Sequence, residues 1–384
     1  MTDEEYRELL SRFRNIRAEE RGYLDALKKR GARIAGVFCS FVPLEILDAA
    51  GLCSVNLRNG EESSILLSGE DLPGNLCPLI QSGYGELFSP RSSCMSFSEL
   101  VIGETSCDGK KKMYELLAEK KELYLMQLPQ GADRPYARKM WIHECRRLLR
   151  ELEKRMGRAV CGEELRAASR DRNSYRLARL RLMQLLRRIP APLSGEELFL
   201  ILEGTERLFP LPGRISLLCE LTAYLEERSR LLPEEGERKR KRILLTGCPI
   251  GGVSEKTLRL IEGAGASVVC LENCGGLKEA YPMVDIDRED IMEAIADRCL
   301  EIGCAVMDPN RRRLDRIREL SKEYRIDGIV DIVLRTCHSY SVERFSVREL
   351  SEGLKIPYSS VEVDYSRSEI PRLATRIEAF LELL

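Results

Sequence analysis

The sequence predicts an α/β protein with two doubly wound, Rossmann-like parallel sheets that face a common cleft, together with additional helices. Two observations predict this architecture. Short apolar runs that have the pattern of strands alternate with helical patterns in both halves of the chain, which is typical of parallel sheets. In both halves, cysteines follow these strands on polar turns. Because open α/β sheets place their ligands at the carboxyl ends of the strands, we expect these turns to line one site.

The stretch 100–117, LVIGETSCDGKKKMYELL, shows this pattern most clearly. Its apolar start is predicted to be a strand, Cys107 lies on the turn behind it, and Asp108 would cap the helix that follows. That helix would point its free N–H groups at whatever Cys107 binds. The same arrangement recurs late in the chain, where a predicted strand over 326–334 is followed by Cys337.

The order of these patterns divides the chain into four predicted parts. We expect an N-terminal helix over residues 1–30, a first Rossmann-like domain over 31–135, a helical region over 136–240 and a second Rossmann-like domain over 241–384. Residues 136–190 hold sixteen Lys and Arg against six Asp and Glu. This excess of positive charge indicates either a solvated helix face or a docking surface for an acidic partner.

Two short segments carry weaker signals. Residues 233–241 (PEEGERKRK) are predicted to form a polar linker into the second domain. Residues 246–252 (TGCPIGG) resemble a phosphate-binding turn, but they lack the Gly-Lys-Ser/Thr ending of a P-loop and the full GxGxxG pattern. A nucleotide site at this turn is therefore a minor alternative.

Composition excludes several classes of function. The formal net charge is −1 over 384 residues, so no nucleic-acid partner and no membrane partner are expected from overall electrostatics. No apolar run reaches the roughly 18 residues of a membrane span, and the N-terminus has no signal-peptide character. These features predict a cytoplasmic location.

The fourteen cysteines, set against only two histidines, indicate a sulfur-rich cofactor site. Disulfides are not expected in a reducing compartment, and a zinc enzyme with several His ligands is disfavoured. Sites that are rich in thiolates and poor in histidine suit iron–sulfur clusters. The sequence contains no CxxC pair, so distant segments would have to assemble any such cluster.

The surroundings of each cysteine separate candidate ligands from structural thiols. Five cysteines lie on polar turns beside Gly, Pro, Ser or Asp and are the strongest candidates: Cys39, Cys77, Cys107, Cys274 and Cys337. Four lie inside apolar runs and are predicted to be buried, inert thiols: Cys53, Cys219, Cys270 and Cys299. Three are intermediate: Cys94, Cys248 and Cys304.

His338 directly follows Cys337 and is the candidate catalytic residue. It could donate a hydrogen bond to a cluster ligand or supply a proton for reduction at a cluster.

Six segments carry a resemblance to a known family. The chain resembles the 2-hydroxyacyl-CoA dehydratase subunit family in GVFCSFVPLEILDAAG, NLCPLIQS, VIGETSCDGKKKMYELL, LTGCPIGG, LENCGG and DGIVDIVLRTCHSY. It resembles the double-cubane-cluster reductase branch more narrowly in LCPLI, TSCDGKKKMYE and TCHSYSVE. The resemblance runs from about Gly36 to Leu384.

The resemblance implies two Rossmann-like domains, a homodimer and an [8Fe–9S] cofactor, in which a sulfide bridges two [4Fe–4S] cubanes. It also implies a partner, an ATP-hydrolysing activator protein with its own iron–sulfur cluster, so that ATP would bind the activator only. Three cysteines match the positions that hold the single cluster of the dehydratases: Cys77, Cys107 and Cys337. Three more are assigned to the second cubane, with Cys248 in reserve: Cys39, Cys274 and Cys304. The segment RSSCMS departs from the Cys-Pro-Tyr type of the branch, which puts a cluster role for Cys94 in doubt.

Three functions follow from these observations. The leading hypothesis is an ATP-activated reductase that passes electrons to a small molecule. The second is a 2-hydroxyacyl-CoA dehydratase subunit with a single [4Fe–4S] cluster, which needs three cluster cysteines. The third is a non-enzymatic iron–sulfur electron carrier or scaffold. If an activator docks, the basic stretches 110–112 and 136–190 are the expected surfaces.

Overall fold

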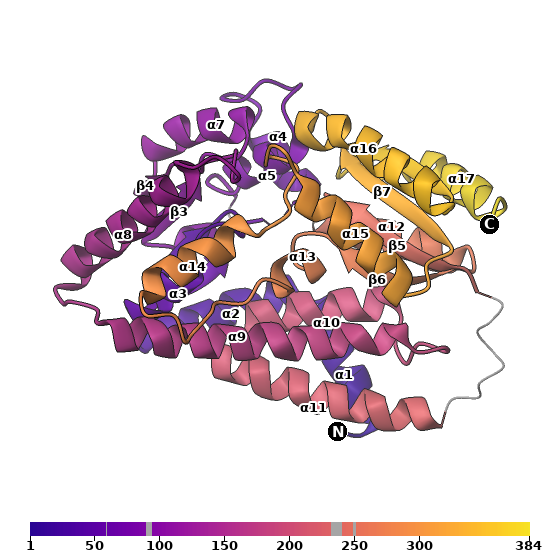
Figure 1. Ribbon diagram of the computed structural model, residues 1–384, viewed down its shortest axis with the longest axis horizontal. Coiled ribbons are helices and arrows are strands. Elements are labelled where there is room, and N and C mark those ends of the chain that lie inside the picture. Colours follow the sequence, from indigo (N-terminus) through magenta and orange to yellow (C-terminus); the bar gives the residue numbers. More distant parts are fainter. Residues whose placement is uncertain (59, 90–93, 232–239, 249–250) are drawn as a thin grey trace.

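Two four-stranded parallel sheets, joined by a layer of long helices, form the fold (Figure 1). The computed structural model describes residues 1–58, 60–89, 94–231, 240–248 and 251–384. The architecture confirms the predicted α/β class with two Rossmann-like sheets. Most of the predicted linker over 233–241 lies outside the described residues, as do two residues of the TGCPIGG segment.

The first sheet comprises β1 (Arg33–Val37), β2 (Leu52–Asn56), β3 (Leu100–Glu104) and β4 (Leu123–Met126). Its strand order is β2-β1-β3-β4, and all neighbours are parallel. The connecting helices are α3 (Leu44–Ala49), α4 (Glu62–Leu67), α5 (Pro78–Gly85), α6 (Cys94–Phe97) and α7 (Asp108–Ala118). The order reverses between β1 and β3, which is where open α/β sheets form a ligand crevice.

The second sheet repeats this topology with β5 (Arg242–Gly247), β6 (Ser267–Glu272), β7 (Gly328–Leu334) and β8 (Tyr358–Val363). Its order is β6-β5-β7-β8, again fully parallel. Its helices are α12 (Gly252–Gly263), α13 (Leu277–Ala280), α14 (Ile291–Leu300), α15 (Arg311–Glu323), α16 (His338–Leu354) and α17 (Ile370–Leu381). Equivalent turns therefore follow β1 and β5, and likewise β3 and β7.

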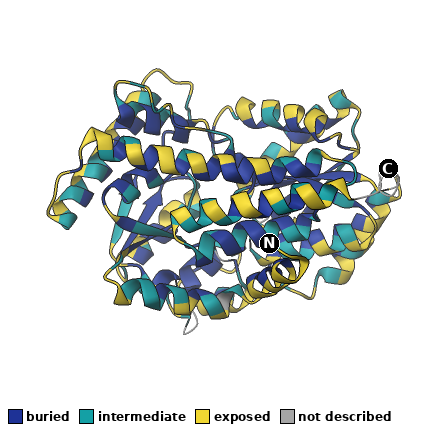
Figure 2. Ribbon diagram, turned by 90° about the horizontal axis from the view of Figure 1, so that it is seen from below, coloured by how far each residue is buried: buried dark blue, intermediate teal, exposed yellow. Residues whose placement is uncertain are grey.

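The helical layer consists of α1 (Asp3–Arg14), α2 (Ile16–Lys29), α8 (Ala137–Met156), α9 (Gly162–Gln184), a 3₁₀ turn (Leu185–Arg187), α10 (Gly195–Leu208) and α11 (Leu211–Arg230). The prediction of one N-terminal helix over 1–30 is wrong in detail. The helix breaks at Asn15, whose N–H donates to the Arg12 carbonyl and closes α1 before α2 begins. Figure 2 shows that these long helices carry exposed residues on one side and buried residues on the other.

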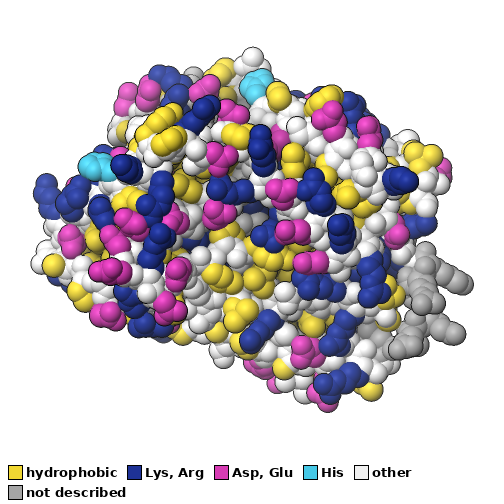
Figure 3. All heavy atoms as spheres, in the orientation of Figure 1, with side chains coloured by type: hydrophobic (Ala, Val, Ile, Leu, Met, Phe, Trp, Pro, Cys, Tyr) yellow, Lys and Arg dark blue, Asp and Glu magenta, His cyan; other side chains and the backbone are white. Residues whose placement is uncertain are grey.

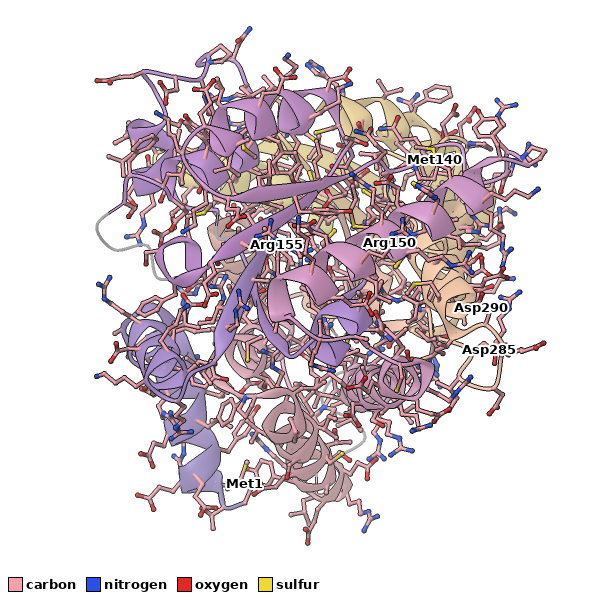
Figure 4. All side chains as sticks on the ribbon, turned by 90° about the vertical axis from the view of Figure 1, so that its left-hand side faces the viewer. Met1, Met140, Arg150, Arg155, Asp285 and Asp290 are labelled. Atoms are coloured by element: carbon pink, nitrogen blue, oxygen red, sulfur yellow. The ribbon has the colours of Figure 1, made fainter. Side chains whose placement is uncertain are left out.

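Helix α14 belongs to the second half of the sequence but packs against α8 and α9 of the helical region (Figure 1). Ion pairs join α8 to α14 and to its N-cap residue. Arg138 contacts Glu293 at 2.6 Å and Asp297 at 2.7 Å, and Arg146 contacts Asp290 at 2.6 Å. Figure 4 shows α8, marked by Arg150 and Arg155, beside the segment that holds Asp290. Arg138 and Arg146 of α8 therefore form ion pairs within the molecule.

Helix α9 buries three arginines, which corrects the expectation of a solvated or docking face along the whole basic stretch. Arg172, Arg176 and Arg179 are 4–5% exposed. Arg172 donates to Asp48 at 2.7 Å, and Arg176 pairs with the buried Glu45. These carboxylates lie on α3, so the basic residues fasten the helical layer to the first sheet. Figure 3 shows acidic and basic side chains interspersed over the remaining visible face.

Two of the four cysteines predicted to be inert and buried are more accessible than expected. Cys270 and Cys299 are buried, whereas Cys53 is half-buried and Cys219 is exposed. Cys219 lies on the outward side of α11, because an apolar run on an amphipathic helix still presents some positions to solvent. In the described part of the chain, no helix is long and apolar enough to cross a membrane.

Candidate functional site

A cavity of about 840 Å³ lies where the carboxyl ends of the two sheets meet, and seven cysteines line it. They are Cys39, Cys77, Cys107, Cys248, Cys274, Cys304 and Cys337. The set contains all six residues predicted as ligands and the one held in reserve. They come from turns behind β1, β3, β5, β6 and β7 and from two loops, so both sheets contribute to one site.

Cys77, Cys107 and Cys337, which we call the first cysteine group, share one structural device. Each is the N-cap residue of a helix: α5, α7 and α16 respectively. N–H groups of the first turn favour the thiolate form of each residue, those of Leu79 and Ile80 at Cys77, that of Lys110 at Cys107 and that of Tyr340 at Cys337. Free N–H groups at a helix N-terminus stabilise negative charge. The predicted N-cap, Asp108, is instead the first residue inside α7.

Neighbouring thiols distinguish Cys337 from the other cysteines of the cavity. The side chains of Cys248 and Cys77 hold the pKa of Cys337 well below its ordinary value. The same contacts, together with burial, raise the pKa of Cys77 and of Cys248. The Cys248 sulfur also accepts the Leu334 N–H at 3.2 Å. This end of the cavity therefore favours one thiolate that is solvated by protein donors.

Cys39, Cys274 and Cys304, which we call the second cysteine group, lie on turns and loops and cap no helix. Burial raises the pKa of Cys39, and burial with the neighbouring Cys274 raises that of Cys304 to about 11. Two lysine ammonium groups oppose these increases in pKa. Lys110 favours the thiolate of Cys39, and Lys278 favours that of Cys304. A negative charge at this group therefore depends on buried ammonium groups.

A charge clamp around Glu279 holds the segments that carry Cys39 and Cys274. Glu279, on α13, accepts from Arg58 at 2.7 Å and from Ser40, the residue next to Cys39. Arg179 of α9 lies 3.8 Å from the same carboxylate and donates to the carbonyl of Gly275. Burial opposes ionisation, but the two arginines hold the pKa of Glu279 at about 2. The first sheet, the second sheet and the helical layer therefore each contribute a residue to the contacts next to the second cysteine group.

Lys110 is not the surface residue that the docking hypothesis requires. Its side chain is only 13% exposed, lines the cavity and lies 2.7 Å from the buried carboxylate of Glu104. Lys111 and Lys112 are exposed and pair with Asp108 and Glu115 on their own helix. Only these two residues of the lysine run lie on the surface.

Two other candidates have distinct positions. His338 is the first residue of α16, is exposed and lines the cavity beside Cys337. Cys94 is buried outside the cavity, where its thiol donates to Glu20 at 3.2 Å. The structure therefore brings His338 to the site but not Cys94.

Sequence reasoning missed the charged residues that surround the thiols: Glu104, Arg58, Lys278 and Glu279. Glu104 ends a buried strand, and an acidic residue at that place was a usable signal. The others become neighbours of the cysteines only through the tertiary fold. Within the described ranges, no three His, Cys, Asp or Glu side chains are grouped so that they could hold a single metal ion.

A family profile described as "2-hydroxyglutaryl-CoA dehydratase, D-component" matches residues 39–384, which include every cavity cysteine. The chain belongs to this family. It is 40% identical over 372 residues to the protein named "Putative dehydratase subunit YjiM" of Escherichia coli (strain K12), covering 96% of each chain. It is 20% identical over 382 residues to the "(R)-phenyllactyl-CoA dehydratase beta subunit" of Clostridium sporogenes, covering 97% of each.

Proposed function

We propose that this dehydratase-family protein is an iron–sulfur reductase that passes low-potential electrons to a small molecule. The first cysteine group would hold one [4Fe–4S] cubane and the second group another, joined by a sulfide as an [8Fe–9S] cofactor. Cys248 would remain in reserve. An ATP-hydrolysing activator protein with its own iron–sulfur cluster would supply the electrons to a homodimer in the cytoplasm.

The convergence of seven thiols on one cavity carries this proposal. Sulfur ligands with little histidine suit iron–sulfur clusters. In a cubane each thiolate binds a different iron, so the ligands surround the cofactor and need not meet at one point. When bound, such a cofactor supplies electrons at a potential set by net charge, hydrogen bonds and exposure. The two groups of three match the number of thiolates that two bridged cubanes need.

The protein provides different support for negative charge at the two ends of the cavity. Cys77, Cys107 and Cys337 lie at helix N-termini, whose N–H groups favour their thiolate forms. Lys110 and Lys278 place ammonium groups near the second cysteine group. Both arrangements would stabilise an anionic cofactor in a site whose cysteines are buried or half-buried.

His338 is suited to the proton transfer that accompanies reduction. It lines the cavity and is exposed, so it can exchange protons with solvent. Histidine is the side chain that most often transfers protons in enzymes. We propose that His338 delivers a proton to the reduced substrate while the cysteines stay bound to the cofactor.

The names of the two relatives favour a second candidate, a dehydratase subunit. For a 2-hydroxyacyl-CoA dehydratase subunit we infer a single [4Fe–4S] cluster. That function would use the first cysteine group and leave the second without a role. A non-enzymatic carrier or scaffold is a third candidate, but it has no need for a cavity of about 840 Å³ beside the thiols.

The test is a reduction assay on protein prepared without oxygen. We expect the visible absorbance of the oxidised protein to bleach only when an activator of this family and ATP are both present. Bleaching at the same rate without ATP would contradict the proposal. Loss of water from a 2-hydroxyacyl-CoA, observed only after a second subunit is added, would support the dehydratase instead.

A further inference from the structure

A buried ion pair, Lys110 with Glu104, lies beside both cysteine groups and has no role as a ligand. Glu104 ends β3 and its side chain is fully buried, while Lys110 lies on the first turn of α7. Their charged atoms are 2.7 Å apart. The Lys110 ammonium also lies over two aromatic rings, with Nζ 5.7 Å from the centroid of Phe38 and 5.9 Å from that of Tyr114.

The two members of the pair have opposite electrostatic effects, and each acts on a cysteine of both groups. Lys110 lines the cavity together with Cys107 and Cys39, and its ammonium attracts negative charge at both cysteines. The carboxylate of Glu104 repels negative charge at the same two residues. Since Cys107 belongs to the first group and Cys39 to the second, one pair of charges is shared by the two halves of the site.

Stability alone gives a poor account of this pair. Burying two charges costs more than an apolar pair of similar size in many proteins. Oε2 of Glu104 is buried and accepts no hydrogen bond from any residue that the structure describes. Three consecutive lysines near the N-terminus of α7 also oppose the helix dipole, and Lys110 is the one among them that turns inward.

We propose that Lys110 and Glu104 set the reduction potential of both cubanes, Lys110 raising it and Glu104 lowering it. This inference rests on the proposed function. An added electron is stabilised by a nearby positive charge and destabilised by a nearby negative one, and the low dielectric of a buried site strengthens both effects. Lys110 and Glu104 are thus positioning residues that act on the cofactor through its ligands.

The experiment compares four variants with the wild type in an anaerobic redox titration followed by electron paramagnetic resonance. Lys110→Met removes the positive charge, Glu104→Gln removes the negative one, and Lys110→Arg retains the positive charge. Lys111→Met is the matched control, because it removes a lysine from the exposed face of the same helix. Iron and sulfide are counted for every sample, so that loss of cofactor is not mistaken for a shift.

We expect Lys110→Met to move the potentials of both cubanes to more negative values and Glu104→Gln to move them to more positive values. Lys110→Arg and Lys111→Met should stay close to the wild type. A merely structural role would not produce shifts of opposite sign. If Lys110→Met loses its iron, the Lys110→Met/Glu104→Gln double variant should have more negative potentials than Glu104→Gln. If Glu104→Gln loses its iron, the double variant should have more positive potentials than Lys110→Met.

Unchanged potentials in a fully loaded Lys110→Met variant, or shifts of the same sign in the two single variants, would overturn the inference. The wild-type iron count separates this failure from that of the proposed function. About four irons per chain would overturn the double-cubane proposal, while opposite shifts of the remaining cluster would still support the ion pair. Wild-type protein that holds no iron–sulfur cluster would overturn both.

Discussion

The two cysteine groups solve the same electrostatic problem in different ways. In the first group, the backbone favours the thiolate forms, because each cysteine is the N-cap residue of a helix and lies beside the N–H groups of the first turn. In the second group, side chains supply most of the compensation, through Lys110, Lys278 and the clamp around Glu279. The first group is therefore encoded locally, whereas the second depends on contacts among the first sheet, the second sheet and the helical layer.

This difference predicts that the two cysteine groups tolerate substitutions at other residues to different extents. A helix N-terminus keeps its donors whatever the neighbouring side chains are. A buried carboxylate between two arginines is sensitive to a single substitution, since removing one partner leaves buried charge without compensation. The second cysteine group should therefore fail first when distant residues are changed.

The largest expected effects come from the ligands themselves. Cys337→Ser should lower the iron content to about half or less, because this sulfur is the thiolate around which the first group is arranged. Cys39→Ser should remove about half of the iron and leave the first cubane. Cys299→Ser is the control, since Cys299 is buried outside the cavity. Full iron retention in Cys337→Ser would contradict the proposed ligand role of Cys337 in the first group.

Glu279→Gln sharpens the comparison without touching a ligand. We expect the free energy of unfolding to fall by about 3 kcal/mol, because Arg58 and Arg179 lose their shared counter-charge. The iron content should fall by about half, with the loss confined to the second group. Urea unfolding and iron counting measure the two effects.

Glu293→Gln on α14 is the matched control for Glu279→Gln, because Glu293 forms a partly exposed ion pair with Arg138. It should keep all of its iron. An equal loss of iron in both variants would mean that the clamp has no special relation to the second cysteine group.

Thiol reactivity at different pH values separates the two groups in the metal-free protein. The pKa of Cys337 lies well below its ordinary value and that of Cys304 is about 11. At pH 8 the thiolate fraction of Cys337 therefore exceeds that of Cys304, of which only about one in a thousand is ionised. Iodoacetamide should therefore label Cys337 at least about tenfold faster, as read by mass spectrometry. Labelling of Cys304 should rise as the pH approaches 11, and equal rates at pH 8 would contradict the assigned difference.

The smallest effects are expected at the surface lysines. Lys111→Ala/Lys112→Ala should change the free energy of unfolding by no more than about 0.5 kcal/mol, because both pairs are exposed. If these lysines contact an activator, ATP-dependent reduction should slow in this variant and slow further at high ionic strength. Reduction by a small chemical donor provides the comparison. Equal rates for both donors would show that this face does not dock the activator.

The fold could be predicted from the sequence because its signals are local. Apolar runs that end at Cys39, Cys107 and Cys337 mark buried parallel strands, and the turns behind them mark the site. The helix break at Asn15 and the exposure of Cys219 could not be predicted, since both depend on how helices pack. The same limit applies to Lys110, because the sequence shows an unusual lysine but not its burial against Glu104.

The first cysteine group was easier to predict than the second for the same reason. Cys77, Cys107 and Cys337 precede recognisable helix starts. Cys304 follows α14, which packs against α8. Its ligand role is implied by the family resemblance and stays a prediction, while the structure places the residue in the lining of the cavity.

The iron and sulfide content of the wild-type protein, prepared without oxygen, tests the central claim most directly. If six cysteines hold two bridged cubanes, each chain should carry about eight irons and about nine sulfides. About four irons with about four sulfides would contradict the account and leave the second cysteine group without its proposed ligand role.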